Sequence, residues 1–242
     1  MVDIVCLDWP APKVVKACWT QRASGVSQAP FSSFNMGAHV GDKPEHVSAN
    51  RDKLSQAIGQ ASIHWLEQVH GVRVVDVATN YTLQADASVC RQQNQVCCVM
   101  TADCLPVFFC DQQGSQVAIA HAGWRGLANG VIQQTLNTFA DPTQVMAYLG
   151  PAISQAAFEV GDDVRDRFLS AGAHLTAHFL EGNSKGKWMA DIYGLARSFL
   201  REARVTQIYG GDRCTYTEQS HFFSYRRDGV TGRMANLIWL ES

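Results

Sequence analysis

The amino-acid sequence predicts an α+β fold, and three observations lead to this prediction. Apolar runs of strand length are mixed with helical patterns, but without the strict strand–helix–strand alternation of a parallel sheet. Hydrophobic residues make up 46% of the 242 residues and charged residues 17%, which is typical of a globular protein with a large core. No Pro/Gly/Ser-rich linker, low-complexity stretch or repeat interrupts the chain, so residues 1–242 are expected to form a single domain.

The first elements expected are a strand and a helix. Val14–Thr20 is a β-branched run typical of a strand, and a polar loop follows it. A helix is expected next, with Asp42 as its N-cap and Glu45 at the capping-box spacing. Apolar residues recur at helical intervals as far as Gly59, which can end the helix in a left-handed conformation.

The centre of the chain is predicted to contain four strands and one helix. The expected strands are Val72–Val77, Cys97–Met100, Pro106–Asp111 and Val117–His121. A turn-rich connection at residues 112–115 predicts that the last two strands pair with each other. Apolar spacing predicts a helix over Leu127–Phe139, which Asp141-Pro142 would end.

The C-terminal third is expected to hold two helices and the closing strands. One helix is predicted over Asp162–Ser170, with an extension past Gly172 to Leu180, and the other over Met189–Arg204. The predicted closing strands are Val205–Tyr209, His221–Tyr225 and Met234–Leu240.

Charge and hydropathy argue against several classes of partner. The formal net charge is -2 and Arg226-Arg227 is the longest basic run, so no nucleic-acid surface is expected. No apolar run approaches the roughly 18 residues that span a bilayer, so no membrane is expected either. Asp3 stands where a signal peptide would carry basic residues, which argues against export. The oligomeric state is left open, a monomer included.

The eight cysteines do not form the pattern of a disulfide framework. Cys97 and Cys98 are adjacent, and no CxxC pair is present. In a chain of this length, reduced and mostly buried thiols are the better interpretation, and they indicate a cytoplasmic protein. Cys104 is the exception because of its neighbours.

Three short segments each carry a residue that commonly binds a metal ion. His70 lies in the segment 67–71, Cys104 between two apolar runs in 101–106, and His121 at the end of an apolar run in 120–126. A thiolate and two imidazoles are good zinc ligands. Three protein ligands leave the fourth position open for water or substrate, as in catalytic zinc sites. A structural cysteine or a core histidine is the competing interpretation for each residue taken alone.

Two neighbours of these residues could take part in chemistry. Arg125 lies in a glycine-framed turn at a predicted helix start, where free N–H groups and a guanidinium would bind an anion. A solvated surface charge is the alternative for Arg125. Asp103, next to Cys104, could support a ligand, accept a proton or cap a turn.

Several segments occur here in the order in which one family has them. They are Ser33–Gly37, Val40–Asp42, Asn50-Arg51, Gln68–Gly71, Thr101–Pro106, His121–Gly126, Leu149–Ile153, Phe223–Gly229 and Thr231–Arg233. From about residue 13 onward the chain therefore resembles the bacterial laccase-domain family. This family is also called polyphenol oxidase or peptidoglycan editing factor, and its members are regarded as purine nucleoside phosphorylases.

The resemblance implies a fold, a metal site and an activity. The fold would be a four-layer α/β/β/α sandwich with mixed sheets, and Zn²⁺ would be held by His70, Cys104 and His121. The reaction would be phosphorolysis of adenosine, inosine and methylthioadenosine, accompanied by adenosine deamination. For these substrates, we expect Arg51 and Arg125 to bind phosphate and Asn35 to bind the sugar hydroxyls.

Three other functions remain open at this point. Cys104 could be a nucleophile with His70 or His121 as its base, which would give a hydrolase or an amidase that edits cell-wall precursors. Two histidines and a cysteine also suit copper, but a multicopper oxidase needs HxH pairs and the chain has none. A non-catalytic binding module is the third alternative.

Overall fold

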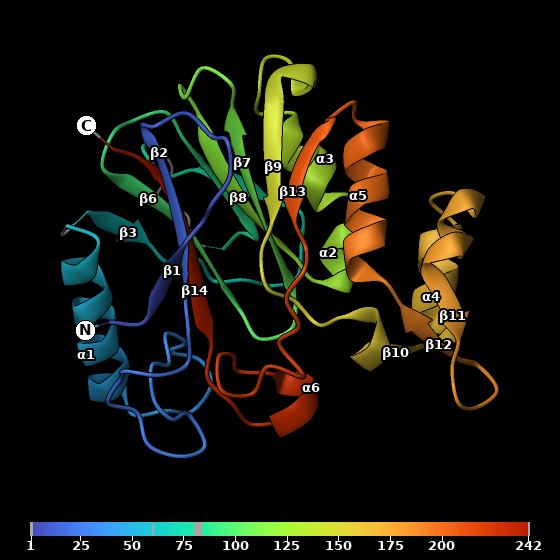
Figure 1. Cartoon of the computed structure of the whole chain (residues 1–242), viewed down its shortest axis with the longest axis horizontal. Coiled ribbons are helices and arrows are strands. Elements are labelled where there is room, and N and C mark those ends of the chain that lie inside the picture. Colours follow the sequence, from blue (N-terminus) through green and yellow to red (C-terminus); the bar gives the residue numbers. More distant parts are fainter. Residues whose placement is uncertain (1, 60, 80–83, 242) are drawn as a thin grey trace.

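Two mixed β-sheets, packed face to face, form the centre of the computed structural model, which describes residues 2–59, 61–79 and 84–241 (Figure 1). In spatial order, the first sheet contains β1 (Ile4–Cys6), β2 (Val15–Thr20), β14 (Met234–Leu240), β6 (Gln95–Thr101) and β3 (Ser62–His64). The second sheet contains β13 (Gln207–Gly210), β9 (Val145–Leu149), β7 (Leu105–Asp111), β8 (Val117–Ala122), β5 (Ala87–Cys90) and β4 (Val74–Asp76). Both sheets combine parallel and antiparallel pairs.

Alternating side chains give each central strand two buried faces. In β7, Phe108 packs in the core between the two sheets, together with Val99 of β6 and Ile238 of β14. Its neighbour Phe109 belongs instead to the core between the second sheet and the helices. Successive side chains of a strand point to opposite faces, so an uninterrupted apolar run is needed where both faces are covered.

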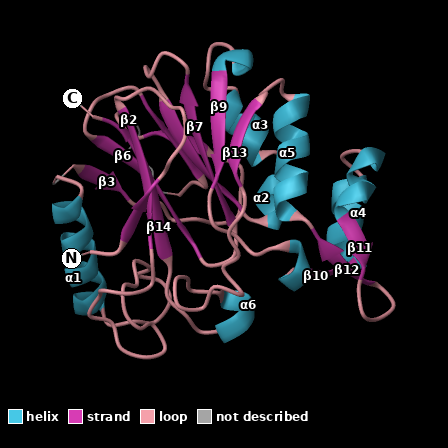
Figure 2. Cartoon of the chain, in the orientation of Figure 1, coloured by secondary structure: helices cyan, strands magenta, loops and turns pink. Residues whose placement is uncertain are grey.

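Helices cover the outer faces of both sheets (Figure 2). On the first sheet, α1 (Pro44–Ala57) buries Leu54 against Cys98 and Leu237. On the second sheet lie α2 (Trp124–Ala128), α3 (Val131–Leu136) and α5 (Ile192–Glu202). The order of layers is helix, sheet, sheet, helix, which confirms the α+β class and the four-layer sandwich.

A smaller unit projects beside the second sheet, at the right of Figure 1. It consists of β10 (Glu159–Gly161), β12 (Lys187–Ala190) and β11 (Phe179–Glu181), with α4 (Asp162–Leu169) packed on them. The remaining elements are α6 (Tyr225–Asp228) and 3₁₀ turns at 142–144, 155–157 and 173–178. None of the helices in the described ranges combines the length and apolar character needed to cross a bilayer.

Two predicted helices begin or continue differently from the expectation. The helix expected over Leu127–Phe139 is divided into α2 and α3, because Gly130 adopts a left-handed φ of 96° that no helix interior allows. The N-cap of α1 is Lys43 without a side-chain cap, so the capping box at Asp42 is wrong. The Asp42 carboxylate instead accepts a hydrogen bond from the amide of Asn35.

Three C-terminal predictions were also wrong in part. The helix predicted to extend to Leu180 ends with α4, and the chain passes through a 3₁₀ turn into β11. The helix expected from Met189 begins only at Ile192, because Asp191 caps α5 and the residues before it pair in β12. His221–Tyr225 forms no strand: His221 ends a turn, residues 222–224 have no regular structure, and Tyr225 begins α6.

Candidate metal centre

Neighbouring strands bring two of the three predicted ligands together. Cys104 lies in the turn between β6 and β7, and His121 lies near the end of β8. Because β7 and β8 are antiparallel and Pro106 pairs with His121, the turn before β7 lies beside the end of β8. His70 arrives from the loop before β4, with its backbone in a left-handed conformation (φ 58°).

The three side chains converge as the sequence predicts. Their candidate ligand atoms all lie within 4.8 Å of one another, and Cys104 Sγ is 3.9 Å from His70 Nε2. Ligand atoms around a tetrahedral zinc ion lie roughly 3.5 Å apart, so small side-chain rotations would complete the set. His121 is buried, Cys104 is half-buried and His70 is exposed, so the group is open to solvent on the His70 side.

A buried carboxylate, Asp86, holds two of these ligands in place. Its Oδ1 accepts hydrogen bonds from His121 Nδ1 (2.8 Å) and from the backbone N–H of His70 (2.9 Å). Its Oδ2 accepts from the N–H groups of Val69 (3.1 Å) and Gly71 (2.7 Å). With Nδ1 of His121 donating to Asp86, Nε2 is the nitrogen left to bind a metal ion. The sequence analysis missed Asp86.

The loop that carries His70 is also fixed to the first sheet. Gln68 Nε2 donates to the carbonyl of Met100 (2.8 Å), and Gln68 Oε1 accepts from the Met100 N–H (2.7 Å). This pair of bonds ties the loop to β6, which runs directly into the turn of Cys104. The positions of His70 and Cys104 are therefore coupled through one side chain.

Gly123 has no side chain, and the ligand side chains of His70 and Cys104 occupy the space that a Cβ would take. Its φ of −62° suits any residue, so glycine is not required by the backbone. A Cβ at this position would lie 2.9 Å from His70 Cδ2 and 3.0 Å from Cys104 Sγ. We expect Gly123→Ala to displace both ligands and, through strain of about 1–3 kcal/mol, to weaken zinc binding roughly tenfold or more.

Competition of the purified variant with a fluorescent zinc chelator measures this effect. Gly161→Ala is the matched control, because its added methyl group meets only the side chain of Asp163, away from the three ligands. Equal zinc affinity in the Gly123 variant and the wild type would show that the ligands do not bind metal where they converge.

Electrostatics favour the thiolate form of Cys104. Burial alone would raise the pKa of Cys104, but the imidazoles of His121 and His70 outweigh it and lower the pKa to about 6. Burial would lower the pKa of His121, yet the Cys104 thiolate and the Asp86 carboxylate raise it to about 9. Asp86 itself keeps a pKa below its usual value, because hydrogen bonds from His121 and the His70 loop outweigh its burial. The thiolate is the form of cysteine that binds metals.

The ligands line a cavity of about 380 Å³. Small-molecule sites have volumes of roughly 300–1,000 Å³. Trp124, Phe158 and Tyr225 supply aromatic surface, and Arg125 and two further arginines supply positive charge. The cavity therefore suits a ligand with a flat apolar part and an anionic part.

Asp103 is next to Cys104, and each oxygen of its carboxylate accepts a hydrogen bond. Oδ1 accepts from Thr215 Oγ1 (2.6 Å), and Oδ2 accepts from the backbone N–H of Arg226 (2.6 Å). Its carbonyl also accepts from the N–H of Ile153 (3.0 Å). These bonds tie the Cys104 turn to two other segments, which favours a positioning role over that of a proton acceptor.

Arg51 and Asn35 lie outside the residues that line the cavity. Arg51 donates from Nε (3.1 Å) and Nη2 (2.8 Å) to the carbonyl of Met36, and its guanidinium lies 3.9 Å from the ring centre of Trp65. Asn35 is fully buried, and its amide bonds to Gly37, Asp42 and the Arg233 N–H. Neither side chain can reach a substrate in the cavity without breaking these bonds. We therefore do not propose that Arg51 binds phosphate directly or that Asn35 binds the sugar directly.

Some lining residues were missed by the sequence analysis. Arg226 and Arg233 come from the C-terminal segments that match the family pattern, and Phe158 precedes β10. The sequence signal for the two arginines was their presence in segments that match the family. Their positions along the chain do not by themselves predict that they reach the cavity.

Comparison with known proteins places the chain among named relatives. The family model described as multi-copper polyphenol oxidoreductase laccase matches residues 16–241. The chain is 51% identical to purine nucleoside phosphorylase YfiH of Escherichia coli, over 99% of this chain and 100% of that protein. It is 49% identical to a purine nucleoside phosphorylase of Pseudomonas aeruginosa, over 97% of each chain.

A solved structure has the same fold. A Neisseria meningitidis protein, 51% identical, superposes with a TM-score of 0.96 and covers 99% of this chain and 100% of its own. Both the fold and the sequence similarity extend over nearly the whole chain.

Proposed function

We propose that this chain, which belongs to the family described as multi-copper polyphenol oxidoreductase laccase, is a zinc-dependent purine nucleoside phosphorylase. The convergence of His70, Cys104 and His121 in a cavity of nucleoside size is the observation that carries the proposal. The names of the relatives, purine nucleoside phosphorylases at 49–51% identity, support an enzyme of that kind.

The number of candidate metal groups supports zinc over multicopper chemistry. Two imidazoles and a thiolate suit either ion, so the ligands alone do not decide. Among the described residues, however, these three form one group that could hold a metal, whereas a multicopper oxidase needs several such groups. Metal analysis of the purified protein distinguishes the two ions.

The proposed reaction is phosphorolysis of adenosine, inosine or methylthioadenosine. When bound by His70, Cys104 and His121, the ion supplies positive charge that stabilises negative charge developing on a purine or an oxygen. Trp124 and Phe158 offer aromatic surface for the base, and Arg125 offers a cation for phosphate. Deamination of adenosine, in which water replaces the amino group at C6, is proposed as a second activity of this site.

Incubation of the purified protein with adenosine tests the reaction class. Free base (adenine, with hypoxanthine from any adenosine that is first deaminated) and ribose 1-phosphate are expected in equal amounts, and only when inorganic phosphate is present. Inosine formed without phosphate would report the deaminase. Adenine released without phosphate would indicate a hydrolase instead, and the absence of any turnover would favour a binding module.

One observation favours a second candidate, a cysteine hydrolase. Asp86, His121 and Cys104 lie in the order carboxylate, imidazole, thiolate, which is the arrangement of a nucleophilic cysteine with its base. A metal chelator separates the two functions. Phosphorolysis should be lost with the chelator and restored by zinc, whereas hydrolysis by free Cys104 should survive it.

A further inference from the structure

Three arginines line the cavity without a carboxylate partner. Within residues 2–59, 61–79 and 84–241, Arg91, Arg165, Arg213 and Arg227 form ion pairs, but Arg125, Arg226 and Arg233 do not. Cations gathered around a cavity repel one another unless an anion joins them. The arrangement therefore indicates a ligand with negative charge.

We propose that Arg226 and Arg233 form the binding site for inorganic phosphate in this cavity. The inference rests on the proposed phosphorolysis, and it adds Arg226 and Arg233 to Arg125 as residues that hold phosphate, in place of Arg51, which does not line the cavity. Arginine presents several donors in one plane, which suits the oxygens of a phosphate better than a single ammonium does.

Arg233 is built into the wall of the cavity. Its side chain is half-buried, and Nη1 donates to the carbonyls of Thr231 and Gly232, both at 3.0 Å. Burial lowers the pKa of Arg233, while the nearby charges of Cys104 and Asp103 act in the opposite direction. A partly buried guanidinium whose remaining donors have no carboxylate partner is expected to bind an anion strongly, because little solvent screens it.

The N-terminal segment around Asn35 holds Arg233 in this position. Asn35 Oδ1 accepts a hydrogen bond from the backbone N–H of Arg233 (2.9 Å). The backbone carbonyl of Arg233 accepts a second one from the N–H of Met36 (3.1 Å), so both sides of the Arg233 backbone are fixed. A Cβ at Gly37 would lie 2.9 Å from Arg233 Cγ, so glycine is needed for the arginine stem to pack there. This gives the Asn35 segment a role in the site without direct substrate contact.

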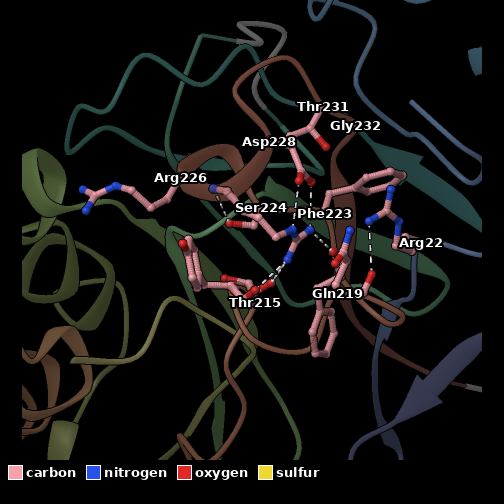
Figure 3. Close-up of polar contacts among 12 residues, drawn as sticks. Arg22, Thr215, Gln219, Phe223, Ser224, Arg226, Asp228, Thr231 and Gly232 are labelled. Atoms are coloured by element: carbon pink, nitrogen blue, oxygen red, sulfur yellow. Dashed lines mark hydrogen bonds and ion pairs between the residues drawn. The ribbon is translucent and has the colours of Figure 1, made fainter. Parts of the chain in front are cut away.

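Arg226 is presented by a rigid turn. Figure 3 shows the side chain of Arg226 pointing away from the hydrogen-bonded network of this turn. Arg227 donates to the carbonyls of Thr215 (2.8 Å) and Phe222 (2.9 Å). The Arg226 N–H donates to Asp103, so the arginine is anchored to the turn of Cys104. Its guanidinium makes one long hydrogen bond, 3.3 Å to the carbonyl of Ala157, and is otherwise available.

A phosphate held by Arg226 and Arg233 would be the nucleophile of the proposed phosphorolysis. A phosphate oxygen forms a bond to C1′ of the ribose as the bond from C1′ to the purine nitrogen breaks. The electron pair leaves with the purine, which takes up the proton that the hydrogen phosphate gives up, and the products from adenosine or inosine are ribose 1-phosphate and free base. The same two arginines should therefore hold the phosphate of the product.

Steady-state kinetics with each substrate varied in turn test the inference. Arg233→Gln and Arg226→Gln should each raise the KM for phosphate by at least about tenfold and change the KM for the nucleoside far less. Arg201→Gln is the matched control, because it removes the same charge from the exposed last turn of α5. Zinc content and Tm verify folding, and Arg226→Gln remains informative if the buried Arg233 variant is unstable.

Direct phosphate binding separates failure of the inference from failure of the proposed function. Calorimetry with inorganic phosphate should show binding to the wild type and a weaker affinity in both variants. Binding that depends on the arginines, without nucleoside cleavage, would uphold the anion site and reject phosphorolysis. Phosphate-dependent cleavage with an unchanged phosphate KM in both variants would overturn the inference and leave the function intact.

Discussion

Cys104→Ala is expected to abolish phosphorolysis and to yield a folded protein with little bound zinc. The sulfur is one of three donors, and its thiolate carries the negative charge of the set. Metal ions contribute several kcal/mol to the stabilisation of a transition state, so loss of the ion should reduce kcat/KM by roughly 1,000-fold or more. Elemental analysis gives the zinc content, and an adenosine phosphorolysis assay on the same preparation gives kcat/KM.

The control for this variant removes a thiol elsewhere. Cys6→Ala changes an exposed cysteine on the edge strand β1 and should leave zinc content and turnover as in the wild type. Wild-type zinc content and activity in Cys104→Ala would contradict the proposed centre. Wild-type zinc content without activity would point instead to the nucleophilic role of Cys104.

The fold class and the convergence of two of the three ligands, Cys104 and His121, could be predicted from local patterns. Apolar runs bounded by turn residues located β7 and β8, and a short connection between such runs implies that they pair. Pairing of these strands places Cys104 beside His121 without further information. The four-layer arrangement followed from the resemblance rather than from the pattern of helices and strands.

Other parts of the site depend on contacts that local patterns do not encode. Asp86 directly precedes the short strand β5 and is separated by 35 residues from His121, whose imidazole it orients. Arg226 was placed next to a predicted strand, but it lies in α6 because Ser224 caps a turn there. A glycine such as Gly130 can be tolerated inside a helix or can end it, and the sequence alone does not distinguish the two cases because tertiary packing determines which one occurs. A single domain and a cytoplasmic location remain predictions.

Asp86→Asn is expected to weaken zinc binding although Asp86 would not touch the ion. All four lone-pair positions of the carboxylate accept hydrogen bonds, two on each oxygen. An amide NH₂ in place of one oxygen would face two N–H donors, and each buried group left unpaired costs about 1–3 kcal/mol. Loss of such an orienting partner typically reduces metal affinity by roughly 10- to 100-fold. Zinc titration and thermal unfolding measure the two effects.

A second carboxylate allows the effect on the metal to be separated from the effect on stability. Asp111 also fixes a loop, by accepting from the N–H groups of Ser115 (2.7 Å) and Gln116 (3.3 Å), but it lies at the far end of β7 from Cys104. Asp111→Asn should lower the Tm while zinc affinity stays at the wild-type value. If both variants lose stability and neither loses zinc affinity, Asp86 only holds the loop, and the orientation of His121 must come from the packing around β8.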